Sequence, residues 1–410
     1  RRAAEAGYLR AASARSTVAV PARRGSENTG FRMPIGPAID LSNASLPAPA
    51  AEIEAAYAAA LRSMSTYLDS HGMEPIGVSV LREVIARRYR EHGLPTSPDQ
   101  IMVTSGAQHA MRLLLGVLDD PGDRVVVDHP TYPNALEAIR RYGARPVPVP
   151  VRPENGPHGG WDLDGVASAV RQTAARTAFL VPDFHNPTGL CLDEDGRAEL
   201  ARIMRDTRTT LVVDESMVDL WLDAPPPPPV AAMPAGASVV TVGSTAKSLW
   251  GWPAGGMDPR RPRHDRPAGR SADRSRPGTP VMEQLARTSA LRRRRTARTS
   301  PRRVEGTASC AVRRLGSAVA RLGVHAGSGR DVAVGEDART GVDLAGCGRA
   351  SHGVLLSAGP RFGVQGAFEH FVRLPYTQDV EVLDDAVEAM AAAYDQVASG
   401  RTPDEARLVV

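Results

Sequence analysis

The chain has 410 residues, and its hydrophobic fraction of 42% excludes wholesale disorder and suits one large domain with smaller ones. Its 50 basic and 46 acidic residues give a net charge of +4, and a single lysine stands among the basic residues. Three scattered cysteines argue against a disulfide framework or a thiolate metal site, and without a membrane span or signal peptide we expect a cytoplasmic protein.

The N-terminal part changes character near residue 51. Residues 1–34 are basic and irregular, and the chain begins with Arg1 instead of methionine, so we expect a longer parent protein. Apolar side chains then recur at helical spacing: Ile53, Tyr57, Leu61 and Met64. A second predicted helix, LREVIARRYREHG, ends at Gly93, where glycine can adopt the left-handed cap.

Residues 101–244 alternate short apolar strands with amphipathic helices. The predicted strands are IMVTSG, RVVVD, AFLVPD, TLVVDES and SVVTVGS, and the predicted helices are AQHAMRLLLGVL, LEAIRRYGA and DEDGRAELARIMRDT. This alternation predicts an α/β fold with a mainly parallel sheet covered on both faces. Ligands of such sheets gather at the carboxyl ends of the strands, so the polar residues there are the candidates for function.

The second half of the chain is less regular. The proline run 225–229 predicts a stiff surface spacer, although a recognition role stays open. Residues 257–350 hold 21 arginines against 9 acidic residues, and a basic segment can bind nucleic acid. Because this segment has almost no aromatic residues to stack on bases, we favour a disordered or out-of-frame stretch. The apolar face of 380–394 predicts a docking helix.

Three motifs follow apolar strands in a fixed order: PDFHNPTG at 182–189, VVDES at 212–216 and GSTAKSLWG at 243–251. With VTSGAQ at 103–108 and PTYP at 130–133, they resemble fold-type I aminotransferases of class I/II that depend on pyridoxal 5'-phosphate (PLP). The likeness is closest to the aminotransferase-like domain of MocR/GntR-type transcription regulators. It implies a three-layer α/β/α large domain, a smaller α+β C-terminal domain, a homodimer and PLP as cofactor.

Lys247 is the candidate that holds this cofactor. PLP requires a primary amine for a Schiff base, and no other lysine side chain exists in the chain. Burial lowers the pKa of a lysine and fits it to act as nucleophile and as proton carrier. The alternative, an exposed solubilising charge, is disfavoured by its position in Ser-x-x-Lys after a strand.

The resemblance assigns roles to two further residues of the motifs. Asp214 matches the aspartate that pairs with the protonated pyridine nitrogen, and alone it can equally cap the next helix. Asn186 matches the asparagine that hydrogen-bonds the ring hydroxyl, and alone it is a turn residue before Pro187.

The remaining candidates bind the ring, the phosphate or the substrate. Tyr132 matches the aromatic residue that stacks on the ring, and Arg373 matches the arginine that binds the substrate carboxylate. Phosphate contacts are assigned to the start of a predicted helix and to a serine, namely Gly106, Ala107, Gln108 and Ser244. Tyr67 resembles the tyrosine that reaches the phosphate of a dimer partner, with a core tyrosine as the alternative.

Two departures from the family pattern concern the cofactor. Past the lysine the sequence reads WGWPAGGMDPRRPRH, and the family's phosphate-binding arginine has no aligned counterpart there. Met217 stands where a tyrosine often hydrogen-bonds the ring oxygen. Both changes predict weaker cofactor binding than in intact family members.

The resemblance divides the chain into five parts. Residues 1–22 are similar to the wing of a GntR-type winged helix, and 23–50 are a linker and N-terminal arm. Residues 51–256 are the large PLP-binding domain, 257–350 the atypical segment, and 351–410 the C-terminal part of the small domain.

Three functions follow from this division. The first is a transaminase that moves an amino group between an amino acid and a 2-oxo acid through Lys247. The second is the effector-binding domain of a DNA-binding regulator, which takes an amino acid or amine and whose DNA-reading part lies mostly outside this chain. The third is a folded but catalytically defective domain.

Overall fold

The computed structural model divides into two compact units, Arg1–Ile35 and Gly36–Val410. It describes residues 9–13, 16–19, 39–44, 46, 48–72, 74–152, 157–221, 224–249, 256–259, 279–296, 323–326, 333–336, 353–368, 371–375 and 377–398. In the first unit, β1 (Leu9–Ser13) and β2 (Ser16–Ala19) form an antiparallel hairpin.

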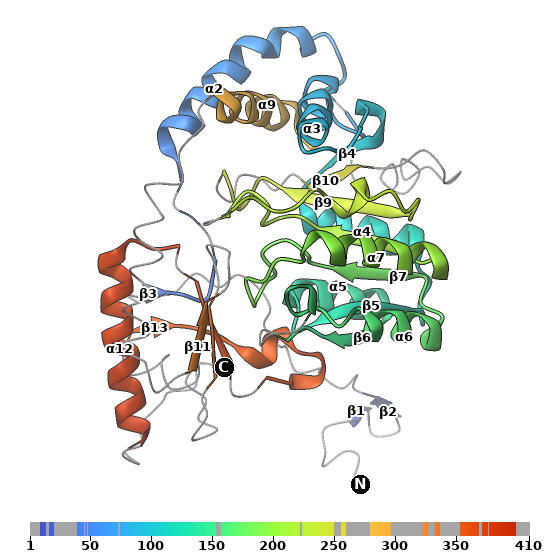
Figure 1. Ribbon diagram of the computed structural model, residues 1–410. Coiled ribbons are helices and arrows are strands. Elements are labelled where there is room, and N and C mark those ends of the chain that lie inside the picture. The colour runs from blue at the N-terminus through green and yellow to red at the C-terminus, as the bar shows by residue number, and fades with distance from the viewer. Residues whose placement is uncertain are drawn as a thin grey trace. The chain divides into compact units, whose positions relative to one another are not determined.

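A seven-stranded sheet forms the centre of the second unit (Figure 1). In spatial order its strands are β4 (Ile101–Thr104), β10 (Gly256–Pro259), β9 (Val239–Ser244), β8 (Thr210–Asp214), β7 (Thr177–Leu180), β5 (Arg124–His129) and β6 (Arg145–Pro150). The neighbours from β9 to β6 pair in parallel, whereas β10 is antiparallel to both β4 and β9. The predicted mainly parallel sheet is confirmed.

Helices cover both faces of this sheet (Figure 1). In the part of the unit that the structure describes, the helices are α2 (Ala50–Ser63), α3 (Ser79–Glu91), α4 (Ala107–Leu118), α5 (Pro133–Tyr142), α6 (Leu163–Thr173), α7 (Glu194–Thr207), α9 (Val281–Thr296) and α12 (Val380–Ala398). Short 3-10 turns lie at Met64–Tyr67, Pro98–Gln100, Pro157–Gly160, Val230–Ala232, Gly359–Phe362 and Val364–Gly366.

Alternation along β8 assigns its side chains to two different cores. Val212 packs with α4 and α5, while Leu211 and Val213 pack with α6 and α7. Successive side chains of a strand point to opposite faces, so each central strand contributes to both cores. The three-layer α/β/α arrangement is therefore confirmed.

Two strands of the sheet were not predicted. The sequence of β6, RPVPVP, lacks the backbone N–H groups that a central strand donates, because three of its six residues are proline. β6 is an edge strand that pairs only with β5 among the described strands, and there proline is tolerated. β10 begins at Gly256 and runs into the atypical segment, of which the structure also describes α9, β11 (Gly323–Ala326) and β12 (Ala333–Glu336).

A smaller antiparallel sheet follows the large domain. Its order is β11, β12, β15 (Phe371–Leu374) and β14 (Ser357–Ala358). Beside it, β13 (Val354–Leu355) pairs in parallel with β3 (Ile39–Asp40) of the N-terminal arm. With the buried face of α12, which includes Leu383 and Val387, these strands form the predicted smaller α+β part.

The predicted helix after residue 51 is present as α2, but one prediction about its face was wrong. Leu61 is 66% exposed, although its spacing placed it on the apolar face with Ile53 and Tyr57. Ala56 and Ala60 are buried instead, since α2 packs on α9 through its small residues. In the described parts of the chain, no helix has the length and apolarity needed to span a membrane.

Asp119 at the end of α4 gives a pH-dependent test of the fold. Its side chain is buried, and burial foremost raises its pKa from 3.8 to about 6, with Asp123 adding to the rise. The folded state thus binds a proton more tightly than the unfolded state, and this stabilising contribution disappears as the pH rises from about 4 to 6. Asp119→Asn should therefore raise the unfolding free energy by about 1–2 kcal/mol at pH 7 and by little at pH 4.

Urea unfolding of the variant at both pH values measures this effect. The control is Asp120→Asn at an exposed neighbouring position, which should change the unfolding free energy by less than about 0.5 kcal/mol. An equal gain for Asp119→Asn at both pH values would contradict the account.

Candidate functional site

The three main motifs meet at one edge of the large sheet. β7, β8 and β9 are parallel neighbours, so their carboxyl ends lie side by side. Asn186 lies in the loop after β7, Asp214 ends β8, and Lys247 lies in the turn after β9. The fold thus gathers residues that are far apart in the sequence.

Asp214 is a buried carboxylate at the centre of this edge. Its Oδ1 accepts a hydrogen bond from the backbone N–H of Ser216 at 2.8 Å. Burial is the main cause that raises its pKa, and the Ser216 hydrogen bonds and the charge of Lys247 oppose the rise. The residues after Asp214 form a turn and not a helix, so the aspartate caps a turn. A positively charged group beside Asp214 would stabilise the ionised carboxylate, which burial disfavours.

Lys247 is half-buried and directed into the site. The Leu249 N–H donates to the Thr245 carbonyl at 2.8 Å and closes the turn that carries the lysine. Its Nζ donates a hydrogen bond to the Ala44 carbonyl of the N-terminal arm. The charge of Lys247 also lowers the pKa of Asp214, which indicates that the two groups are close. The lysine is therefore not a plain surface charge.

Ser244 ends β9 just before this turn. Its Oγ accepts from the Ala246 N–H at 3.1 Å and is half-buried. Gly106 stands across β10 at the start of α4 with φ of 121°, a backbone conformation that glycine adopts without strain. The N–H groups of Ala107 and Gln108 belong to the first turn of α4, where helical N–H groups lack partners within the helix.

Tyr132 lies at the start of α5 and contacts the start of α4. Its hydroxyl accepts from Gln108 Nε2 at 3.0 Å and from Asn134 Nδ2 at 2.8 Å. Burial foremost raises the pKa of Tyr132, with Asp214 raising it further and Arg373 lowering it. These electrostatic effects indicate that the ring lies within range of both charged groups.

Arg373 of β15 joins the small sheet to the large one. Its Nη1 donates to Asn186 Oδ1 at 3.3 Å, and its Nη2 donates to the Ser42 carbonyl of the arm. The guanidinium carbon lies 5.3 Å from the centre of the Phe362 ring. Arg373, Phe362 and Phe371 line a cavity of about 70 Å³, which offers a carboxylate-binding group beside apolar walls.

Two predicted features lie elsewhere. Tyr67 packs against the cluster formed by α2, α3 and α9, and burial foremost raises its pKa, with Glu74 adding to the rise. The contact predicted for Tyr67, with the cofactor phosphate, is to a second copy of the chain. Met217 is buried against Phe184 and Leu220, so it fills a small apolar cluster where the family pattern has a tyrosine.

Sequence reasoning missed a second buried polar cluster behind Asp214. The N–H of Glu215 donates to the Val242 carbonyl at 2.8 Å, so the strand pairing continues and Glu215 points to the face opposite Asp214. There Glu215 Oε2 accepts from the Tyr89 hydroxyl at 3.0 Å. This alternation was visible in the sequence, since two acids in succession on a strand cannot share one face.

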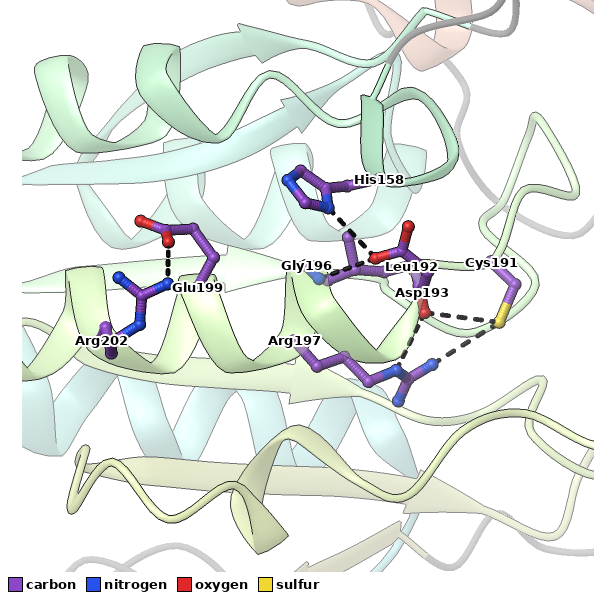
Figure 2. Close-up of polar contacts among 8 residues, drawn as sticks. All are labelled: His158, Cys191, Leu192, Asp193, Gly196, Arg197, Glu199 and Arg202. Carbon is purple, nitrogen blue, oxygen red and sulfur yellow. Dashed lines mark hydrogen bonds and ion pairs between the residues drawn. The ribbon is translucent and has the colours of Figure 1, made fainter.

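Arg197 and Asp183 complete that cluster. Arg197 Nη2 donates to Asp183 Oδ1 at 2.6 Å, and both side chains are 1% exposed. Figure 2 shows the guanidinium beside Cys191 and the Leu192 carbonyl, to which Nε donates at 2.9 Å. The sequence held a signal here as well, because Arg197 continues the apolar stripe of α7 through Leu200, Ala201 and Met204.

Known proteins with similar sequences include two kinds, transcriptional regulators and aminotransferases. The uncharacterised HTH-type transcriptional regulator YdcR of Escherichia coli (strain K12) is 30% identical over 192 residues, which are 46% of this chain and 40% of that protein. A probable aspartate/prephenate aminotransferase of Thermus aquaticus is 32% identical over 184 residues, which are 44% of this chain and 46% of that protein. The chain thus spans less than half the length of these two relatives.

Solved structures match most of the chain. The α-aminoadipate aminotransferase LysN of Thermus thermophilus, complexed with N-(5'-phosphopyridoxyl)-L-leucine, has a TM-score of 0.76 at 22% identity over 88% of this chain and 93% of that one. Aspartate aminotransferase of Thermus thermophilus with maleate has a TM-score of 0.72 at 24% identity over 87% of this chain and 91% of that one. These likenesses show the fold alone.

The family follows from a direct match of the sequence. Residues 39–256, just over half of the chain, match the family model for aminotransferase class I and II. This range contains every motif that carries the resemblance, from VTSGAQ to GSTAKSLWG. The chain belongs to the aminotransferase class I and II family.

Proposed function

We propose that this chain binds pyridoxal 5'-phosphate through Lys247 and transfers an amino group between an amino acid and a 2-oxo acid. The observation that carries the proposal is that the chain's lone lysine lies in the turn after β9, next to the buried Asp214 that ends the neighbouring parallel strand β8, at the carboxyl edge of the sheet. Covalent binding of the cofactor needs the amine of Lys247. The carboxylate of Asp214 would keep the ring nitrogen protonated, so that the ring can withdraw electrons.

The residues present fit this cofactor. Asp214 is buried and its charged form is disfavoured there, so a protonated ring nitrogen is the kind of partner that would stabilise it. Bound PLP supplies an aldehyde for the amine and a ring that accepts electrons from the substrate. The free N–H groups at the start of α4 suit a phosphate, as anions bind at helix N-termini.

Each remaining candidate has a role in orientation. Tyr132 would lie against the ring, Asn186 would donate to its hydroxyl, and Ser244 would contact the phosphate. Tyr67 would reach the phosphate of a second copy in a homodimer. Arg373 would hold the substrate carboxylate, because its guanidinium is buried beside an apolar cavity that shields the pair from water.

A second candidate is the effector-binding domain of a DNA-binding regulator. It rests on the similarity to YdcR and on the hairpin of β1 and β2 in the part predicted to be a winged-helix wing. The same cofactor site would then bind an amino acid or amine without turnover. A cytoplasmic location suits both candidates and stays a prediction.

The experiment adds PLP to the full chain and then challenges it with a set of amino acids and 2-oxo acids. A transaminase releases a new 2-oxo acid, whereas an effector domain changes the visible absorbance without releasing one. If no lasting visible absorbance remains after dialysis, the proposed cofactor binding is wrong.

Asp214→Ala is the variant that sharpens this test. Loss of the charge-assisted contact to the ring nitrogen, about 1.5–3 kcal/mol, should weaken PLP retention roughly ten- to a hundredfold and remove transamination. Equilibrium dialysis measures retention, and Asp206→Ala, at an exposed site on α7, is the control. Unchanged retention in Asp214→Ala would show that another group holds the ring nitrogen.

A further inference from the structure

A cavity of about 480 Å³ lies behind the predicted cofactor site. It is bordered by α3, by Arg197 at the start of α7 and by the proline run 225–229. Among the predicted cofactor-site residues only Ser244 lines it, at one end. Glu215 and not Asp214 faces it, as the alternation of β8 requires. The cavity is therefore separate from the site of the proposed amino-group transfer.

Two ionisable residues at the end of α3 line the cavity together with the buried groups: Glu91 pairs with Arg87 of the same helix, and burial foremost lowers the pKa of His92. The remaining charges leave one acid in excess. Arg197 is paired with Asp183, and Arg88 of α3 is paired with Asp219. Glu215 is the remaining carboxyl group in the interior of the cavity, and its hydrogen bond from Tyr89 comes from a neutral hydroxyl. With Glu91 balanced by Arg87 and His92 neutral, an ionised Glu215 would thus give the cavity a net charge of −1, which a monovalent cation would balance.

Asp183 provides an independent sign of a missing partner. Its Oδ1 accepts from Arg197, and it is 1% exposed, yet no described residue donates to its Oδ2. A buried carboxylate oxygen without a donor is unfavourable, so such oxygens are normally hydrogen-bonded. Asp183 lines the cavity, so a bound ligand with N–H groups would balance Glu215 and, once the Asp183 carboxylate turns toward it, would donate to this oxygen.

The walls of the cavity indicate the chemical class of the ligand. Tyr89 and Trp221 are aromatic and the proline run is apolar, which suits an alkyl chain with a cationic end. In the part of the chain that the structure describes, no three potential metal ligands gather, so two carboxylates here favour an organic cation over a metal ion. A volume of about 480 Å³ is in the range of small-molecule sites.

We propose that this cavity is a second ligand site, which binds a small organic monocation with N–H donors on an alkyl chain through Asp183 and Glu215. The proline run thereby becomes a wall of a binding site, with the Pro228 carbonyl 3.4 Å from Arg197 Nη1. The site does not depend on the cofactor or on transamination.

The protonation of Glu215 predicts how binding depends on pH. Burial foremost and then the charge of Asp183 raise the pKa of Glu215 to about 8, while Tyr89, Arg197 and Arg88 lower it. At neutral pH this carboxyl group is protonated, and a bound cation favours its ionised form. Binding must then release a proton, and affinity must rise with pH until Glu215 is ionised in the free protein.

The test uses n-butylguanidinium, which stays charged at every pH used and forms no Schiff base with PLP. Isothermal titration calorimetry of the full chain should show affinity rising up to about tenfold per unit between about pH 6 and 8 and levelling off above. The isosteric neutral compound n-butylurea should bind at least about tenfold more weakly at pH 9.

Two variants make the result specific to this cavity. Glu215→Gln keeps an acceptor for Tyr89, and it should lose the pH dependence and weaken binding at pH 9 about ten- to a hundredfold. Glu199→Gln removes the same charge from the exposed face of α7, where Glu199 pairs with Arg202, and should bind like the unchanged chain (Figure 2). Equal affinity for the guanidinium and the urea, or pH-independent binding by the unchanged chain, would overturn the proposal.

Discussion

Replacing Lys247 with alanine should abolish covalent retention of PLP completely. No other lysine side chain exists in the chain, so no neighbouring amine can take over the Schiff base. After incubation with PLP and reduction with borohydride, the intact mass of the unchanged chain should rise by one cofactor. The mass of Lys247→Ala should stay that of the bare protein, and the visible absorbance should be lost on dialysis.

Lys247→Arg separates the amine from its charge. Arginine keeps a positive charge near Asp214 and the Ala44 carbonyl, but it forms no stable Schiff base. This variant should bind PLP reversibly and lose it on dialysis, with folding unchanged in thermal melts. A reduced cofactor adduct on either variant at a single position would show that an amine other than Lys247 holds the cofactor.

Replacing Arg197 with methionine should lower the free energy of unfolding more than any other substitution predicted for this chain. The guanidinium and Asp183 are both buried, so the variant leaves an ionised carboxylate without a cationic partner inside the protein. Breaking a buried pair in this way costs about 3–5 kcal/mol of unfolding free energy. Urea unfolding monitored by circular dichroism measures the loss, which should appear as a lower midpoint.

Arg202→Met is the matched control on the same helix. Arg202 pairs with Glu199 on the exposed face of α7, as Figure 2 shows, and exposed pairs contribute about 0–1 kcal/mol. The double variant Asp183→Leu with Arg197→Met should recover part of the loss, because no unpaired charge stays buried. A loss below about 1 kcal/mol for Arg197→Met would mean that water or another residue replaces its contact to Asp183.

The sequence by itself determined the large domain and the identity of most candidate residues. Strands such as TLVVD and SVVTV are continuous apolar runs, and a run of this kind has few other stable positions than the interior of a sheet. Polar residues directly after them, such as Asp214 and Ser244, must then lie at its carboxyl edge. The position of Gly106 could also be predicted, since it lies in the turn between an apolar strand and a strongly apolar helix.

Only the tertiary structure decided which groups complete the site. The Ala44 carbonyl that accepts from Lys247 is 203 residues away, and the Ser42 carbonyl that accepts from Arg373 is 331 residues away. Backbone carbonyls are chemically alike at every position, so no sequence pattern marks the ones that a distant side chain reaches. The packing of β3 against β13 selects them.

The sequence indicated which way Arg197 and Glu215 point, but that they form a cluster with Asp183 was decided by the tertiary structure for a related reason. Each residue is of an ionisable type, and such residues in a sequence are ordinarily a sign of exposure. Their burial is stable only because an arginine from α7 meets an aspartate that follows β7, and because Glu215 receives a hydrogen bond from α3. Local patterns fix the direction of a side chain on its own strand or helix, whereas the compensation of a buried charge depends on what the other elements bring to it.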